Sequence, residues 1–153
     1  MIHAATLEDA AWLTAIWNRM IADTLFTFTT ERKTESATAE MIQARPVLVL
    51  PDQAGFATYG PFRAGPGYSA TVEHSILLDA SAQGRGQGRA LMDALMELAR
   101  CENHHVMVAG ISGANPNAVA FHAALGFETV AQMPEVGRKA GQWLDLILMQ
   151  KRL

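Results

Sequence analysis

The segment Gln83-Gly84-Arg85-Gly86-Gln87-Gly88-Arg89-Ala90-Leu91 is the most informative part of this sequence. The pattern before it predicts a strand, and the pattern after it predicts an amphipathic helix. Its three glycines let the backbone adopt positive φ and approach a ligand closely. Free amides at the start of a helix form an anion site, and Arg85 and Arg89 add positive charge. The segment therefore predicts a site for a phosphate or pyrophosphate.

Two common phosphate motifs do not match this loop. The dinucleotide fingerprint requires Gly-x-Gly-x-x-Gly, and the third glycine here comes one residue early. A Walker A loop requires Gly-Lys-Ser/Thr, which the segment lacks. The alternative that stays open is a flexible connector whose glycines only relieve backbone strain.

The composition is typical of a single globular domain, which we expect to span residues 1–153. Hydrophobic residues make up 50% and charged residues 18% of the chain, a balance unlike that of disordered proteins. The net charge of -3 argues against a general nucleic-acid binder. The only cysteine, Cys101, cannot form an intrachain disulfide, which suits a reducing cytoplasm. No apolar run approaches the ~20 residues that span a bilayer, and residues 1–6 lack a signal-peptide pattern. We expect a cytoplasmic protein without membrane contacts.

Hydrophobic periodicity and turn signals predict mixed α and β structure on both sides of the loop. Helices are expected from the Thr6 cap to about residue 23, over 34–44, from the loop to about 101, and from 116 to the glycine at 126. Strands are expected over residues 2–5, 47–50, 56–60, 68–78, 106–109 and 143–149, and from 127 onward. Residues 24–29 have no partner nearby and are expected to form an ordered loop.

The spacing Gln83-x-x-Gly86-x-Gly88 is similar to the pyrophosphate loop of the GCN5-related N-acetyltransferases (GNAT), which bind acetyl-CoA. The block Asn115-Pro116-Asn117-Ala118-Val119-Ala120-Phe121-His122, followed by Leu125-Gly126-Phe127, resembles a second segment of that family. Val72-Glu73-His74-Ser75 and Val136-Gly137-Arg138-Lys139 resemble the branch of phosphinothricin and methionine sulfone/sulfoximine acetyltransferases. The resemblance implies an α/β (α+β) fold with a mixed, mostly antiparallel central sheet, flanked by helices and splayed for acetyl-CoA. It also implies a homodimer.

By this resemblance, acetyl-CoA contacts three residues of the long strand, the glycine loop and two residues near the last helix. These are Ile76, Leu77, Leu78, Gln83, Gly84, Arg85, Gly86, Gln87, Gly88, Arg89, Asn115 and His122. Asn115 is also a good helix cap, and both roles are compatible. His122 stands where many members have a tyrosine that protonates the leaving thiolate. An imidazole donates a proton near pH 7, and the alternative is that His122 only contacts the cofactor.

Glu73 is the candidate general base. A lysine-like amine has a pKa of about 10.4, so freeing its lone pair at pH 7 costs roughly 4 kcal/mol. A carboxylate on a strand among apolar and hydroxyl residues has a raised pKa and accepts a proton directly or through water. The resemblance places Glu73 at the position of the branch's base. The alternative is an exposed strand residue or an ion-pair partner.

The amine acceptor is expected near Phe28, Arg63, Glu73, His74 and Ser75, which the resemblance assigns to substrate binding. Arg63 suits a bidentate pair with a substrate carboxylate, and otherwise is a solvated loop arginine. Gly65 stands where the branch implies a second arginine, which weakens the case for a doubly anionic acceptor. The adjacent His104 and His105 have no further ligands at metal-binding spacing, so no metal is expected.

The sequence therefore predicts an enzyme that transfers acetyl from acetyl-CoA to the amine of a small amino acid or analogue, of phosphinothricin or methionine sulfone/sulfoximine type. Two alternatives stay open. One is a non-catalytic CoA-binding sensor module, which needs no base. The other is a peptide or protein N-terminal acetyltransferase on the same fold.

Overall fold

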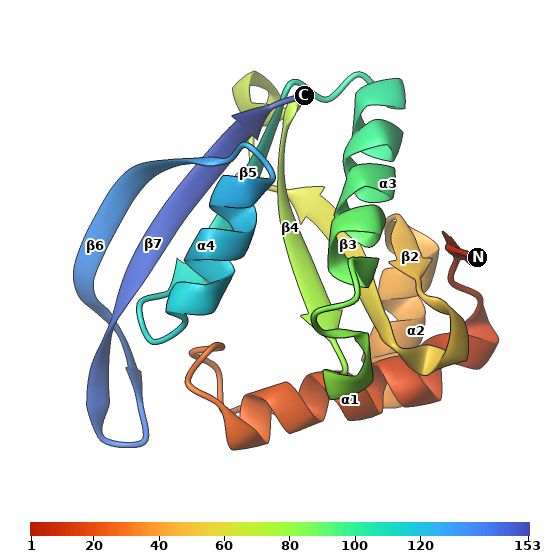
Figure 1. Cartoon of the computed structure of the whole chain (residues 1–153), viewed down its shortest axis with the longest axis horizontal. Helices are drawn as coiled ribbons and strands as arrows, with labels where there is room; N and C mark the ends of the chain where they lie inside the picture. The colour runs from red at the N-terminus through yellow and green to blue at the C-terminus, as the bar shows by residue number, and fades with distance from the viewer.

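The computed structural model describes residues 1–153, in which seven strands form one mixed sheet (Figure 1). The strands are β1 (His3–Ala4), β2 (Val47–Val49), β3 (Gly55–Pro61), β4 (Thr71–Leu78), β5 (Val106–Ser112), β6 (Glu128–Lys139) and β7 (Gln142–Arg152). Their order across the sheet is β1-β2-β3-β4-β5-β7-β6. Only β4 and β5 pair in parallel, and every other neighbouring pair is antiparallel. The predicted mixed, mostly antiparallel sheet is confirmed.

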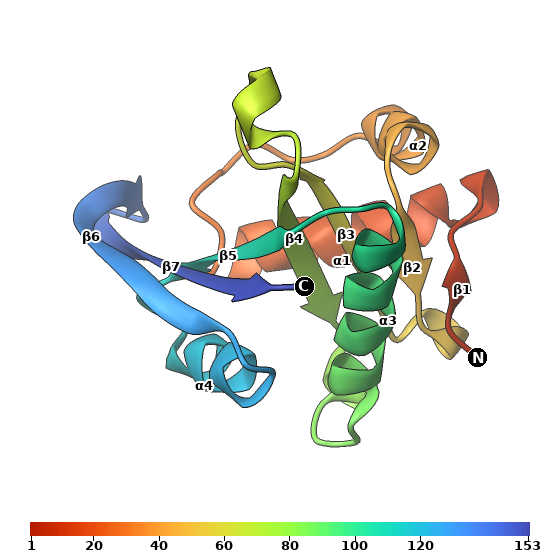
Figure 2. The same cartoon turned by 90° about the horizontal axis from the view of Figure 1, so that it is seen from above.

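Four α-helices cover the two faces of this sheet. They are α1 (Ala10–Asp23), α2 (Glu35–Ala44), α3 (Gln87–Cys101) and α4 (Pro116–Ala124). Seen from above, α3 and α4 lie on one side of the sheet and α1 and α2 on the other (Figure 2). Because side chains alternate between the faces of a strand, β4 sends Val72 into the core beneath α3 and Leu77 into the smaller core beneath α1.

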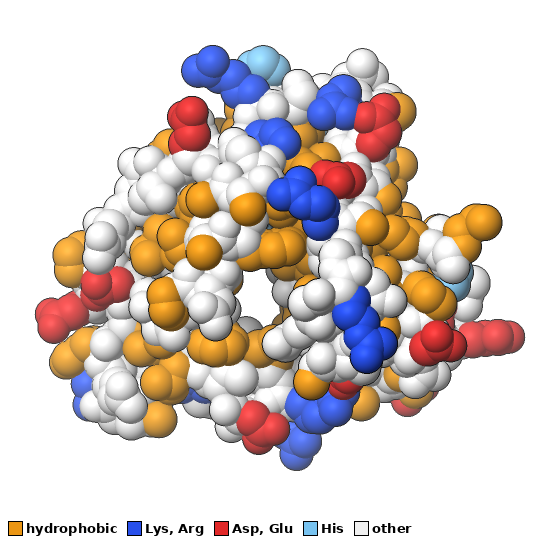
Figure 3. All heavy atoms as spheres, viewed as in Figure 1, with side chains coloured by type: hydrophobic (Ala, Val, Ile, Leu, Met, Phe, Trp, Pro, Cys, Tyr) orange, Lys and Arg blue, Asp and Glu red, His pale blue; other side chains and the backbone are white.

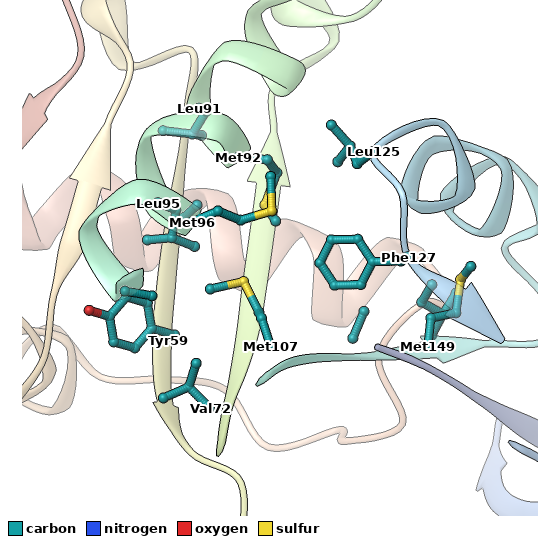
Figure 4. Packing of buried hydrophobic residues seen from close by; sticks show 14 of the residues in the cluster. Tyr59, Val72, Leu91, Met92, Leu95, Met96, Met107, Leu125, Phe127 and Met149 are labelled. Carbon is teal, nitrogen blue, oxygen red and sulfur yellow. The ribbon is translucent and has the colours of Figure 1, made fainter. Parts of the chain in front are cut away.

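The larger core lies between α3 and the sheet (Figure 4). Leu91 and Leu95, one turn apart on α3, are fully buried and share this core with Met107 and Phe127. A buried side chain of this size contributes roughly 1.5–3 kcal/mol. The core therefore fixes α3, and with it the glycine loop that leads into α3, against β4.

Local signals placed most helix ends correctly. Thr34 caps α2 by accepting a hydrogen bond from the Ala37 N–H at 3.1 Å, and Asn115 caps α4 by accepting one from the Ala118 N–H at 3.2 Å. Gly126 follows α4 with φ of +90°, as expected for a glycine that ends a helix.

The largest differences between the predicted and the observed strand bounds are in β4, β5 and β7. β4 begins at Thr71 and not at residue 68, because Pro66–Tyr68 forms a 3₁₀ turn. β5 extends to Ser112, three residues beyond the predicted end. β7 is also longer, because it pairs with β5 on one side and β6 on the other.

Lys139, at the end of β6, connects the β6–β7 hairpin to the segment after α1. The side chain is 7% exposed. Its Nζ donates hydrogen bonds to the Ile21 carbonyl at 2.7 Å and to the carbonyl and hydroxyl oxygens of Thr27 at 2.9 and 3.1 Å. Nearby, Phe28 packs over Gly137, where a Cβ would meet the ring at 2.5 Å. These contacts hold residues 24–28 against the sheet, so the segment is an ordered loop as predicted.

We expect Lys139→Met to destabilise the fold by about 1–3 kcal/mol, because it leaves the buried Ile21 carbonyl and the partly buried Thr27 carbonyl without their donor. Urea unfolding followed by circular dichroism measures the change. Arg32→Met is the matched control, since it also removes one positive charge but from an exposed position. Equal stability of the two variants would contradict the proposed anchoring.

Candidate functional site

The glycine loop presents main-chain donors that no protein group satisfies. Gly84 and Gly86 have φ of +71° and +74°, and α3 begins directly after them at Gln87. The main-chain N–H groups of residues 84–89 donate to no acceptor within the protein, and the first one that does is that of Ala90, to the Gly86 carbonyl. An array of exposed N–H groups at the positive end of a helix binds an anion. The loop therefore fits a diphosphate.

Gly88 has a different role from the one predicted. It lies inside α3 and is buried, and its φ is not positive. A Cβ at this position would lie 2.8 Å from Leu78 Cδ1 and 3.4 Å from the Phe121 ring. Gly88 therefore lets the first turn of α3 approach the end of β4, and only Gly84 and Gly86 use the left-handed conformation.

A cavity of about 510 Å³ lies beside this loop and runs along the start of α4. Its walls include six predicted cofactor residues besides the glycines: Ile76, Leu78, Gln83, Arg89, Asn115 and His122. The guanidinium of Arg89 donates to the Ala124 carbonyl at 2.7 Å. Arg85 is exposed on the loop. A long ligand with an anionic group at one end fits this space.

A second cavity, of about 190 Å³, lies where β4 and β5 stop pairing. The two strands pair from Thr71 with Val106 to His74 with Ala109, and both continue beyond that point. The residues that follow, Ser75 to Leu77 and Gly110 to Ser112, line the cavity. The space-filling view shows an opening at this place, between α4 and β4 (Figure 3). Main-chain groups of Ile76 and Leu77 therefore border the space in which a thioester would lie.

Glu73 lies on the face of the sheet that α1 covers, as does Leu77, because residues two apart point the same way. Its Oε1 lies over Gly110, 2.9 Å from the position that a Cβ would occupy there. The side chain is exposed to solvent in part, and partial desolvation raises the pKa of its carboxyl group. Glu73 is therefore next to the smaller cavity, beside Ser75 and Gly110, and has the character expected of a proton acceptor.

His74 points to the opposite face and pairs with His122. The two rings stack with centroids 5.0 Å apart, and their Nε2 atoms are 3.0 Å apart. His122 Nδ1 lies 2.7 Å from the Ala118 carbonyl, which only accepts, so this nitrogen carries the proton. His122 Nε2 then accepts from His74 Nε2–H, and His74 Nδ1 is buried without a partner. Desolvation lowers the pKa of His74 to about 3 and also lowers that of His122. Both imidazoles are neutral in this arrangement.

The predicted acceptor residues do not all lie in one cavity. His74 and Ser75 line the smaller one, together with Phe26 and Thr27 of the loop after α1. Phe28 lies beside this loop and packs over β6 at Gly137. Arg63 lines a third cavity, of about 470 Å³, and lies about 6.0 Å from the Tyr68 ring centroid.

Sequence reasoning missed two features of the smaller cavity. Gly110 makes room for the Glu73 carboxylate, and a glycine directly after the strand predicted over 106–109 was the available signal. Ser112 Oγ donates to the Leu25 carbonyl at 2.7 Å and so holds the loop after α1 at the rim. Trp17, which contacts Phe56, also lines this cavity.

No three His, Cys, Asp or Glu side chains come together as a metal site would require. None of the helices is both long and apolar enough to cross a membrane.

Comparison with known proteins agrees with this geometry. Residues 13–127 match the model of the acetyltransferase (GNAT) family. The L-methionine sulfoximine/L-methionine sulfone acetyltransferase of Salmonella typhimurium is 38% identical, over 99% of this chain and 94% of its own. The phosphinothricin N-acetyltransferase of Streptomyces coelicolor is 32% identical, over 95% of this chain and 92% of its own.

Two solved structures have nearly the same fold. A putative acetyltransferase from Salmonella typhimurium, solved with its cofactor acetyl-CoA, superposes with a TM-score of 0.95 at 37% identity, over 100% of this chain and 93% of that one. A protein from Brucella melitensis described as a ribosomal-protein-alanine N-acetyltransferase superposes with a TM-score of 0.94 at 35% identity, over 100% and 99% of the two chains. The glycine loop, the family match over most of the chain and these relatives agree: the chain belongs to the acetyltransferase (GNAT) family and is an acetyl-CoA-dependent N-acetyltransferase.

Proposed function

We propose that this enzyme transfers the acetyl group of acetyl-CoA to the amine of a small amino acid or analogue, of methionine sulfone/sulfoximine or phosphinothricin type, with Glu73 as the general base. One observation carries the proposal. Unsatisfied main-chain donors lie at one end of β4, and a carboxylate with a raised pKa lies in the same strand, beside the place where β4 and β5 stop pairing. The relatives named for those acceptors support the substrate class.

Different residues of the chain bind different parts of acetyl-CoA. The N–H groups of residues 84–89 bind the diphosphate. Main-chain groups of Ile76, Leu77 and Leu78 hold the pantetheine arm and the thioester carbonyl, since successive residues of a strand offer their N–H and C=O groups to alternate sides. Asn115 uses its Oδ1 to cap α4, which leaves its amide N–H₂ for the same arm.

Glu73 then has one task in the reaction. The acceptor arrives mostly as an ammonium ion, because amine pKa values lie at about 8 to 10.4. The Glu73 carboxylate takes a proton from it, directly or through a water molecule. The amine nitrogen forms a bond to the acetyl carbon, the carbon–sulfur bond breaks, and the second proton that the nitrogen loses passes through water in the open cavity to the thiolate. His122 serves as a contact to the cofactor here, because its Nδ1 proton is bound to Ala118 and its Nε2 accepts from His74.

A second candidate function is supported by the Brucella structure, which is described as acting on a ribosomal-protein alanine. A peptide N-terminus would then replace the free amino acid as acceptor. The homodimer and the cytoplasmic location stay predictions.

An acceptor panel distinguishes the two functions. Thiol release from acetyl-CoA is measured with methionine sulfone, methionine sulfoximine, phosphinothricin, ordinary amino acids, polyamines and short peptides. We expect turnover with one or more of the small amino acids and little with peptides. Preference for a peptide supports the second candidate, and binding of acetyl-CoA without turnover of any acceptor supports a sensor.

We expect Glu73→Gln to lower kcat at pH 7 by on the order of 10²- to 10⁴-fold, the usual contribution of a general base. The loss should shrink as pH rises, because a growing fraction of the acceptor is then already unprotonated. In the wild type, the raised pKa of Glu73 moves the acidic limb of the pH–rate profile to higher pH than an ordinary glutamate gives. Glu40→Gln, at an exposed position of α2, is the control. Unchanged rates at every pH would exclude Glu73 as the base.

We expect Gly86→Val to weaken the binding of CoA by about tenfold or more, because valine disfavours φ of +74° and the loop loses its array of donors. Isothermal titration calorimetry measures the affinity. Gly141→Val is a closely matched control, since Gly141 has the same φ and equally open surroundings but lies in the β6–β7 turn. Wild-type affinity in the Gly86 variant would remove the loop as the diphosphate site.

A further inference from the structure

Arg45, directly after α2, lies across the sheet from Glu73. Its guanidinium covers Gly60 on β3, where a Cβ would lie 2.8 Å from Nη1 and 3.1 Å from Cζ. Gly60 is the antiparallel partner of Glu73. Directly opposed residues of an antiparallel pair point to the same face, with Cβ positions about 4.5–5.5 Å apart. The guanidinium therefore lies on the same face as the proposed base, one strand away.

Arg45 and Glu73 do not pair with each other. The Glu73 carboxylate leans over Gly110 on β5, and Arg45 lies over Gly60 on β3, so the two charges flank β4 on opposite sides. Three ion pairs are present in the protein, and Arg45 belongs to none of them. Its guanidinium also donates to no other protein group, so a rigid fork of N–H donors is free.

The cavity that Arg45 lines has a surplus of positive charge. Arg63 is its second arginine. Its one carboxylate, Glu102, already accepts a hydrogen bond from the Tyr59 hydroxyl and lies 3.7 Å from His104 Nε2. A compact anion is therefore the ligand that suits the side of the cavity nearest Gly60.

We propose that Arg45 binds the α-carboxylate of the acceptor while Glu73 faces its α-amine, so that the site selects zwitterionic amino acids. Gly60 and Gly110 lie on the two strands that flank β4. Gly60 is level with Val108, two residues before Gly110, so the two glycines are about 12 Å apart. A zwitterion with a hydrogen bond of about 2.8 Å at each end spans most of that distance, and the flexible side chains of Arg45 and Glu73 span the rest. A peptide N-terminus or a polyamine has no carboxylate beside its amine and gains nothing from Arg45. The inference rests on the proposed function and specifies its substrate class.

The test compares an acceptor with its own carboxamide. Initial rates are measured for L-methionine sulfone, or for the best amino acid of the panel, and for the matching α-carboxamide, with wild type, Arg45→Ala and Arg45→Lys. We expect Arg45→Ala to raise KM for the free acid by about 10- to 100-fold, the usual loss of a charged hydrogen-bonded pair. KM for the carboxamide and for acetyl-CoA should stay within about twofold. Arg45→Lys should recover part of the loss, because it retains the charge but not the fork.

Gly60→Ala is an independent variant that leaves Arg45 in the chain. The new Cβ would lie 2.8 Å from Nη1, so the flexible end of Arg45 must move away. It should raise KM for the free acid in the same direction as Arg45→Ala. Arg32→Ala, which removes an exposed arginine outside the cavity, is the control and should leave both acceptors unchanged. Thermal unfolding verifies that each variant is folded.

The outcomes separate this inference from the proposed function. If wild type acetylates amino acids but Arg45→Ala has an unchanged KM, or an equal increase for acid and carboxamide, the role of Arg45 is refuted and the proposed function stands. If wild type acetylates no free amino acid, the proposed function and this inference both fail. A KM increase confined to the free acid supports both.

Discussion

The close approach of α3 to the end of β4 fixes the geometry of the whole site. Gly88 makes this contact, because any side chain there would collide with Leu78. The anion-binding turn and the strand that carries Glu73 are therefore one packed unit. Glu73 lies five residues before Leu78, about 17 Å along the strand at ~3.4 Å per residue. That length sets the distance between the diphosphate end of the site and its reacting end, and it is independent of any flexible loop.

The alternation of side chains along β4 divides the chemistry between the two faces of the sheet. Glu73 and Ser75 point toward α1, where the acceptor is proposed to bind. His74 points the other way and is buried against His122. A ligand at the point where β4 and β5 stop pairing meets residues of both faces, because His74, Ser75 and His122 all line the cavity there. One strand thus carries both the proposed base and residues that line the two cavities.

Much of the fold and half of the site could be predicted from the sequence, because the signals are local. The glycine loop, the Asn115 cap and the end of α4 at Gly126 each depend on a few consecutive residues. The start of β4 was predicted too early because the turn at Pro66 interrupts a segment of strand-forming residues. The partners of Lys139 are 118 and 112 residues away in the chain, and no local pattern reveals them. Arg45 was missed because its place on the same face as Glu73, one strand away, depends on the register of β3 and β4.

Lys139 carries a primary amine, the same kind of group that the enzyme acetylates in its substrate. The protein handles an activated acyl group, and any free amine near that group is a potential acceptor. Lys139 anchors the loop at the rim of the smaller cavity, yet its three N–H bonds all point at oxygen atoms. The same hydrogen bonds that hold the loop therefore keep this amine directed at carbonyl and hydroxyl oxygens, and Lys139 does not line the smaller cavity.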